Sequence, residues 1–217
     1  MSYYEVVLFS ASIFIATVIG WVRFSKTGPS ILPFLLCLTI GTVNEVLSFI
    51  LTMSGNYTTL NNNIYVLAEA LCITWQFRRW ELFRKAARWY YAIMIFIILL
   101  WIIDYLVFTD FSKLNFYFRI FYSFLIVLMS VQMNNILIFT FRKRLLQSHI
   151  FLICSGFIIY FTYKILIETF WLYGLAKSRD FRISVYLVLA WINLIVNIIY
   201  ALAMLWIPKK PQHITLS

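Results

Sequence analysis

Residues 31–53 read ILPFLLCLTIGTVNEVLSFILTM, an apolar stretch interrupted near its middle by Asn44 and Glu45. A run of about 20 apolar residues is long enough to cross the hydrocarbon core of a bilayer as an α-helix. Polar residues are costly at such a depth, so those that occur there are candidates for function. This stretch therefore indicates a membrane-spanning helix, and the polar residues within such helices are the candidates for function.

Six further stretches resemble it in length and composition, and only the third along the chain is short. We expect spans at 5–22, 31–53, 63–77, 89–108, 115–141, 149–175 and 183–207. The sequence thus predicts an all-α membrane protein, a seven-transmembrane-helix bundle. We expect a single domain over residues 1–217, without a soluble domain.

Positive charge lies mostly in alternate gaps between these spans. The second gap is uncharged and the fourth holds only Asp110 and Lys113. Because Lys and Arg accumulate on the cytoplasmic side, we expect the N-terminus outside and the C-terminus in the cytoplasm. The sixth gap, with Lys177, Arg179 and Arg182, is an exception: either it is a basic external loop, which we favour, or one span is miscounted. The basic residues of the predicted cytoplasmic segments are Arg23, Lys26, Arg78, Arg79, Arg84, Lys85, Arg88, Arg142, Lys143, Arg144, Lys209 and Lys210.

Composition excludes several classes of protein. With 63% hydrophobic residues and a mean hydropathy of +0.88, the chain has too little polar surface for a soluble domain. Its net charge of +10 does not indicate nucleic-acid binding, because the basic residues flank spans and meet anionic lipid headgroups. We expect the lipid bilayer as a partner, no nucleic acid, and a multi-pass location in a plasma membrane, most simply a bacterial inner membrane.

The sequence contains no metal-binding or catalytic motif. The cysteines fall inside spans, and the histidines lie at a span edge and in the tail, without ligand spacing. We therefore expect no metal, no cofactor, no catalytic residue and no enzymatic activity. The residues concerned are Cys37, Cys72, Cys154, His149 and His213.

Polar residues recur at three- and four-residue steps on five predicted spans, which places them on one face of each helix. Counting inward at 1.5 Å per residue puts Glu45 about 12 Å and Glu69 about 9 Å from the outer span ends. All the ionisable residues inside the spans fall in the outer half. This predicts an outward-facing polar chamber. Its candidate ligand-binding residues are Asn44, Glu45, Tyr65, Glu69, Asp104, Arg119, Tyr160, Lys164, Glu168, Asn193 and Asn197.

The same charges have an alternative interpretation as contacts that only hold helices together. Lys164 would then pair with Glu168, and Arg119 with Glu69 or Asp104. Four acids against two bases leave two carboxylates without a cationic partner, and these persist only if protonated, hydrated or holding a cation. The surplus favours a site for a small polar or cationic ligand.

Two functions fit such a chamber. The first is a receptor or sensor module, which needs a separate cytoplasmic signalling partner at the basic loops 78–88 and 142–144. The sequence RRWELFRKAAR at 78–88 predicts a short interfacial helix, because Trp80, Phe83 and Ala87 share one face.

The alternative is a small-solute or cation carrier. The spans divide as three, one and three with the two triplets in the same orientation, a plan similar to that of the SWEET sugar carriers and PnuC vitamin carriers. That similarity is limited to topology. A structural membrane subunit, an embedded enzyme using Glu45 and Glu69, and a retinal protein are less favoured. Rhodopsins carry their lysine in the seventh span, and 183–207 contains none.

The orientation can be tested with reporter fusions. Fusions after Thr58 and Lys113 should report an exterior location, and fusions after Lys85, Lys143 and Lys210 a cytoplasmic one. An alkaline phosphatase reporter, which is active only outside, and a cytoplasm-active fluorescent reporter would give complementary signals. A cytoplasmic signal at Thr58 would reverse the predicted orientation.

Overall fold

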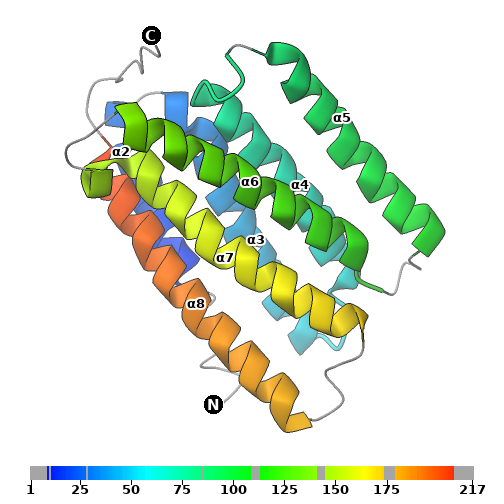
Figure 1. Ribbon diagram of the computed structural model, residues 1–217. Helices are drawn as coiled ribbons and strands as arrows, with labels where there is room; N and C mark the ends of the chain where they lie inside the picture. Colours follow the sequence, from blue (N-terminus) through cyan, green and yellow to red (C-terminus); the bar gives the residue numbers. More distant parts are fainter. Residues whose placement is uncertain are drawn as a thin grey trace. The chain divides into compact units, whose positions relative to one another are not determined.

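The computed structural model describes residues 9, 11–27, 29–84, 86–108, 113–140, 145–173 and 179–207. Over these residues the secondary structure is mainly helical, without strands. A π-helical turn, Asp104–Phe108, continues α5. The α-helices, coloured along the chain in Figure 1, are α2 (Ile13–Thr27), α3 (Leu32–Met53), α4 (Thr59–Arg79), α5 (Ala87–Ile103), α6 (Phe116–Thr140), α7 (His149–Leu172) and α8 (Arg179–Trp206).

Five of the described helices, α3, α5, α6, α7 and α8, are long and apolar enough to cross a membrane. The apolar part of α2, Ile13–Ser25, is shorter, and α4 has 21 residues but a lower hydropathy. The prediction of an all-helical protein with several helices of membrane-crossing length is therefore confirmed. The count of seven spans and the orientation of the termini stay predictions.

The chain divides into two compact units. We call Trp21–Phe118 the 21–118 unit; α3, α4 and α5 lie within it. Met1–Gly20 and Arg119–Ile207 form the 119–207 unit, which contains α7, α8 and nearly all of α6. Helix α2 is divided between the units at Gly20. The sequence expectation of a single domain stays a prediction.

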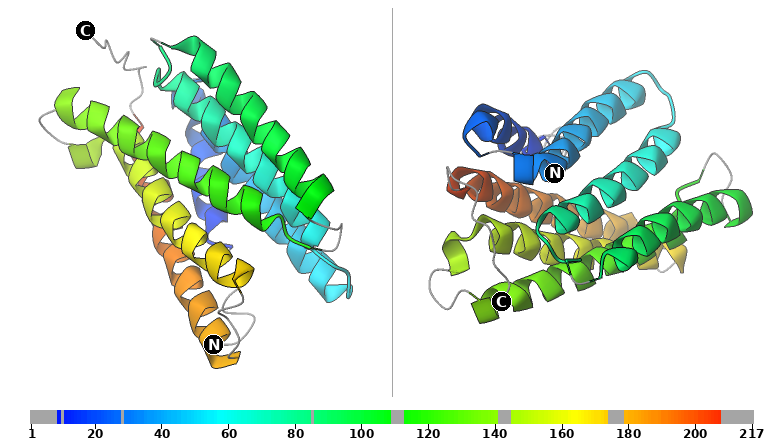
Figure 2. Two further views of the ribbon diagram at one scale, coloured as in Figure 1. Left: turned by 45° about the vertical axis from the view of Figure 1, so that its right-hand side comes forward. Right: turned by 90° about the horizontal axis from the view of Figure 1, so that it is seen from above.

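In the 21–118 unit, antiparallel α3 and α4 lie side by side, and α5 runs back along α4 (Figure 2). Helix α4 contributes Val66, Ala70, Ile73 and Phe77, spaced at three or four residues and each at most 1% exposed. This spacing places the four side chains on one buried face, and the small Ala70 permits close helix packing.

Helix ends in this unit differ from the sequence prediction at two places. Helix α4 begins at Thr59 and ends at Arg79, so it is longer than the predicted 63–77 because polar residues continue the helix beyond the apolar run. The interfacial helix predicted at 78–88 is wrong. Residues 80–84 form turns, Glu81 has a φ of 62°, and a left-handed residue interrupts an α-helix.

In the 119–207 unit, α7 packs along α8 and is antiparallel to both α6 and α8 (Figure 1). Helix α6 buries one stripe, Tyr122, Ile126, Met129, Met133 and Leu137, at three- and four-residue steps. Such a stripe is the buried face of an amphipathic helix. Between α7 and α8 the approach is close at Gly156, where an added Cβ would lie 2.5 Å from Cε1 of Tyr200.

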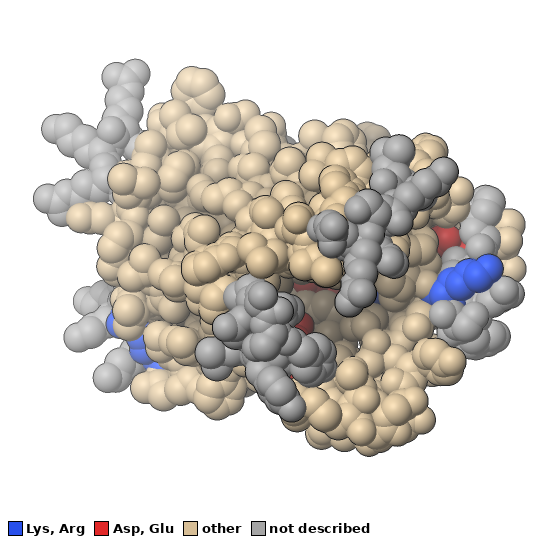
Figure 3. Space-filling model, turned by 90° about the horizontal axis from the view of Figure 1, so that it is seen from below, with Lys and Arg blue, Asp and Glu red and all other residues tan. Residues whose placement is uncertain are grey.

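The outer surfaces of both units are apolar. Val43, Val46 and Ile50 on α3 are each more than half exposed, as are Trp89 and Ile95 on α5. On the face shown in Figure 3, Lys, Arg, Asp and Glu are sparse among the described residues. Exposed apolar surface on this scale indicates contact with lipid or another protein.

The Gly156 contact predicts a stability effect. Gly156→Ala should lower the free energy of unfolding by about 1–3 kcal/mol, because the added methyl overpacks the Tyr200 ring. Thermal unfolding in detergent measures it. Combining Gly156→Ala with Tyr200→Leu should cost less than the sum of the two single substitutions, since the smaller side chain makes room. Additive effects would show that the residues do not touch.

Candidate functional site

An amide cluster joins α3 to α4 near the turn that connects them. Asn61 Nδ2 donates to Asn44 Oδ1 at 2.8 Å and to Ser48 Oγ at 3.3 Å. Asn44 Nδ2 donates to Asn62 Oδ1 at 3.3 Å. Asparagine both donates and accepts, so these groups satisfy one another where water is scarce. The cluster brings Asn44, a predicted site residue, into contact with Asn61 and Asn62, and Asn61 also contacts Ser48.

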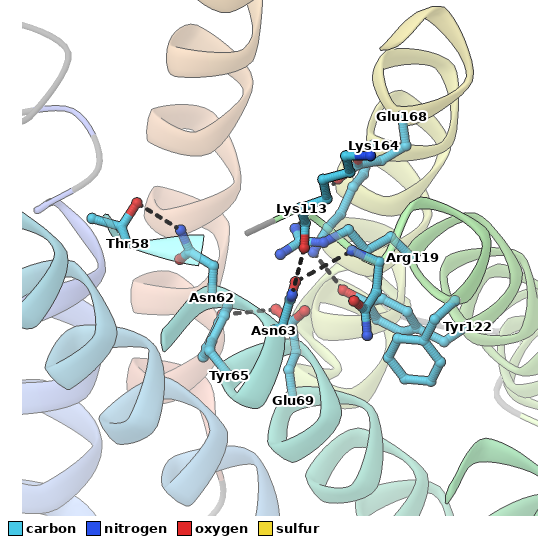
Figure 4. Close-up of polar contacts among 12 residues, drawn as sticks. Thr58, Asn62, Asn63, Tyr65, Glu69, Lys113, Arg119, Tyr122, Lys164 and Glu168 are labelled. Atoms are coloured by element: carbon cyan, nitrogen blue, oxygen red, sulfur yellow. Dashed lines mark hydrogen bonds and ion pairs between the residues drawn. The ribbon is translucent and has the colours of Figure 1, made fainter. Parts of the chain in front are cut away.

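Tyr65 and Glu69 continue this polar row along α4. The Tyr65 hydroxyl donates to Glu69 Oε1 at 2.8 Å (Figure 4), as their i, i+4 spacing allows. Glu69 is 5% exposed. Because α4 begins at Thr59, Glu69 lies about 15 Å from the helix start, near the midpoint of α4. It is therefore deeper than the shorter predicted span implied.

In the other half of α4, two buried polar side chains are hydrogen-bonded to backbone groups. The Thr74 hydroxyl donates to the Ala70 carbonyl at 2.8 Å. Gln76 Nε2 donates to the Ser30 carbonyl, and its Oε1 accepts from the Phe34 backbone N–H, both at 2.9 Å. That N–H belongs to the first turn of α3, where a helix has no internal acceptor. Gln76 is therefore a structural tie between the helices.

Glu45 lies apart from the amide cluster. Asn44 is buried, whereas Glu45, the next residue, is exposed beside Val43 and Val46, which are 58% and 55% exposed. Successive helical residues point about 100° apart, so one turn of α3 presents an amide inward and a carboxylate outward. That Glu45 and Glu69 serve one chamber stays a prediction.

Asp104 has a structural role at the start of α6. Its Oδ2 accepts from the Phe118 backbone N–H at 2.8 Å, and Asp104 is 1% exposed. A carboxylate at a helix N-terminus satisfies a free N–H group and opposes the positive end of the helix dipole. Asp104 therefore belongs to the connection from α5 to α6.

Asn63 was not among the predicted site residues, yet it organises the same connection. Its Nδ2 donates to the Lys113 carbonyl at 2.9 Å (Figure 4), and its Oδ1 accepts from the Asn115 backbone N–H at 3.3 Å. Trp101 Nε1 donates to the Asn63 carbonyl at 2.9 Å. Three consecutive asparagines at 61–63 are the sequence signal that marks this position.

In the 119–207 unit, Arg119 pairs with Glu168. Arg119 Nη1 donates to Glu168 Oε1 at 3.4 Å, and the residues are 8% and 7% exposed. Arg119 lies in the first turns of α6 and Glu168 near the end of α7. Each charge is repelled by the dipole of its own helix, because a cation is unfavourable at a helix N-terminus and an anion at a C-terminus. Antiparallel packing places them together, and each partly offsets the charge of the other. The structure thus gives Arg119 this partner, where the sequence suggested Glu69 or Asp104.

Lys164 lies one turn before Glu168 on α7, among aromatic rings. Its Nζ donates to the Tyr122 hydroxyl and lies 5.1 Å from the Tyr122 ring centroid and 5.4 Å from that of Tyr160. Such cation–π contacts stabilise a desolvated ammonium. Tyr122 was missed because a tyrosine within an apolar span gives no distinct signal.

The predicted site residues on α8, Asn193 and Asn197, are not part of the contacts described above. Asn197 Nδ2 donates to Ser12 Oγ at 2.8 Å, which holds α8 to the segment before α2. Asn193 lies one turn earlier on α8 and is half-buried. Within the described part of the chain, no three His, Cys, Asp or Glu residues come close enough to hold a metal ion.

The basic end of α4 is stabilised by aromatic rings. The Arg78 guanidinium lies 4.5 Å from the Tyr90 ring centroid and 5.1 Å from that of Tyr91, and Arg79 lies 5.7 Å from that of Trp75. Both arginines are exposed. The second predicted docking loop, 142–144, and Lys85 lie outside the described residues, so partner docking there stays a prediction.

The role of Asn63 gives a testable prediction. Asn63→Leu should lower the free energy of unfolding by about 2–4 kcal/mol, because it leaves the buried Asn115 N–H without its partner and removes the bond to the Lys113 carbonyl. Asn135→Leu, at an exposed position on α6, is the matched control and should change stability little. Thermal unfolding of both variants in detergent makes the comparison. Equal effects would show that Asn63 is not a structural tie.

Comparison of the chain with protein-family models, with curated proteins and with solved structures finds no match. The function is therefore argued from the residues and their geometry.

Proposed function

We propose that this chain is a seven-span membrane protein that acts as a receptor or sensor module for a small polar ligand. Its N-terminus is outside, its C-terminus is cytoplasmic, and a separate cytoplasmic partner carries the signal onward. The membrane is a plasma membrane, most simply a bacterial inner membrane. The five described helices of membrane-crossing length support the membrane part of this proposal.

The observation that carries the proposal is the gradient of burial along the polar row of α4. Asn61, Asn62 and Tyr65, at the end predicted to face outside, are partly exposed. Glu69 is 5% exposed and Gln76 is fully buried. A ligand could therefore reach the amides and Tyr65 from one side only, with Glu69 at the inner limit.

Glu69 is the residue on which function should depend. An ionisable group near the middle of a membrane helix costs several kcal/mol unless it is paired or hydrated. Tyr65 donates to Glu69, and a carboxylate attracts hydrogen-bond donors and cations. We therefore propose that Glu69 binds the cationic or hydrogen-bond-donating part of the ligand.

One-sided access favours reception over transport, because a carrier exposes its site to each side in turn. The contacts of Gln76 with Ser30 and Phe34 at the start of α3 would have to break for such a change. The exposed arginines Arg78 and Arg79 at the other end of α4 are the proposed docking position of the signalling partner, together with loop 142–144.

A carrier is the second candidate, and the two compact units are the observation that favours it. Alternating access commonly uses the movement of one group of helices against another. The division differs from the three-one-three plan, because α5 groups with α3 and α4 instead of standing alone. The candidate therefore rests on the existence of two units and not on that plan.

Substitution of Glu69 tests the proposed function. In a host strain that lacks the protein, the wild-type protein should restore the transcriptional response that the deletion abolishes. Glu69→Gln should fail to restore it while reaching the membrane at normal levels. The substitution keeps shape and removes charge, so the reason for the loss is electrostatic. Asp110→Asn, between the fourth and fifth predicted spans, is the matched control and should restore the response.

Full restoration by Glu69→Gln would refute the assigned role. Receptor and carrier are separated by comparing metabolite pools with transcripts in the same strains. Loss of a carrier changes the cellular pool of one external solute, whereas loss of a receptor changes transcription without first changing that pool.

A further inference from the structure

The 119–207 unit contains buried hydrogen-bond donors without a protein partner. Arg119 Nε and Nη2 and Ser123 Oγ are each buried and make no hydrogen bond to the described residues. Arg119 is 8% exposed and Ser123 is fully buried. Buried polar groups are nearly always hydrogen-bonded, and unpaired donors on a charged guanidinium are especially costly. These three atoms therefore need an acceptor.

The arrangement of the three atoms defines the acceptor. The Nε–H and Nη2–H groups lie on one edge of the planar guanidinium and point in parallel, which matches two oxygens of a carboxylate or phosphate. Ser123 lies one turn further along the same face of α6, so its hydroxyl can donate to the same group. Glu168 contacts the other terminal nitrogen, Nη1, so the Nε and Nη2 edge is not used by that pair.

The local charge also favours an anion. Arg119 and Lys164 carry two positive charges and Glu168 one negative charge, which leaves a net charge of +1. The Arg119–Glu168 distance of 3.4 Å is longer than the 2.7–2.9 Å of a strong charge-assisted hydrogen bond, so the arginine is incompletely neutralised. Figure 4 shows these side chains together with Tyr122 on α6 and α7.

We propose that the Nε and Nη2 edge of Arg119, with the Ser123 hydroxyl, binds an oxyanion, the carboxylate or phosphate group of a ligand or lipid. Lys164 contributes positive charge, and Glu168 holds the guanidinium and weakens the affinity for the anion. This site lies in the 119–207 unit and is independent of Glu69, so it goes beyond the proposed function.

The test uses the full chain, purified in detergent and delipidated. Thermal unfolding is followed while sodium phosphate or sodium acetate replaces sodium chloride at constant ionic strength. A ligand that binds only the folded state raises the midpoint as its concentration increases. We expect such a rise for wild type with at least one of the two oxyanions.

Substitutions should change this response in opposite directions. Arg119→Lys keeps the charge but loses the bidentate Nε and Nη2 edge, and it should abolish the rise in the unfolding midpoint. Arg79→Lys, at an exposed arginine, is the matched control and should keep that rise. Glu168→Gln should tighten apparent binding about tenfold, because it removes the competing negative charge. A merely structural Arg119–Glu168 pair predicts no such gain.

Ser123→Ala gives a second measurement if Arg119→Lys does not fold, and it should weaken the response. Glu69→Gln should leave the response unchanged, so a failure of the proposed function and a failure of this site are distinguishable. Native mass spectrometry before delipidation identifies the source. Phospholipid retained by wild type, lost in Ser123→Ala and displaced by phosphate assigns the oxyanion to a headgroup.

Two results would overturn the proposal. One is the absence of any response of wild type to phosphate or acetate together with the absence of retained phospholipid. The other is an equal response of wild type, Ser123→Ala and Glu168→Gln, which would show that the three donors do not bind the anion.

Discussion

In an apolar helical protein every polar group that leaves water must find a partner within the protein, and this requirement organises the described structure. Gln76 supplies both a donor and an acceptor to the start of α3, and Asn63 binds three backbone or side-chain groups around the α5–α6 connection. Both side chains are fully buried. Apolar packing alone does not select one relative position of helices in lipid, because lipid is as apolar as the side chains, so such ties set the register.

The same requirement explains how charge is distributed. Among the described buried residues, the 21–118 unit holds two acids, Glu69 and Asp104, and the 119–207 unit holds Arg119, Lys164 and Glu168. Asp104 is used at a helix N-terminus and Glu168 by Arg119. We propose that Glu69 and the guanidinium edge of Arg119 bind groups from outside the protein. One favours a cation or donor, and the other favours an oxyanion.

Much of the fold could be predicted, because the helices of a membrane protein follow from the length of its apolar runs. Helix α3 differs from the predicted span by one residue, and α8 ends within one residue of it. The start of α4 could not be predicted in this way, because Asn61 and Asn62 in its first turn are polar and find partners on α3. The helix predicted at 78–88 was wrong because local spacing was misleading. Its apolar residues have helical spacing, but Glu81 adopts a left-handed conformation.

The sequence by itself determined that the chain is helical, with several helices of membrane-crossing length, because hydropathy and helical periodicity are local properties of the chain. Periodicity did not place every polar residue, since Asn44 is buried and Glu45 is exposed. The sequence also indicated which ionisable residues lie in those helices. Only the tertiary structure decided their partners: Glu168 for Arg119, Tyr122 for Lys164, and a helix N-terminus for Asp104. Pairing depends on how antiparallel helices are aligned, and residues far apart in the chain share no local signal of that alignment.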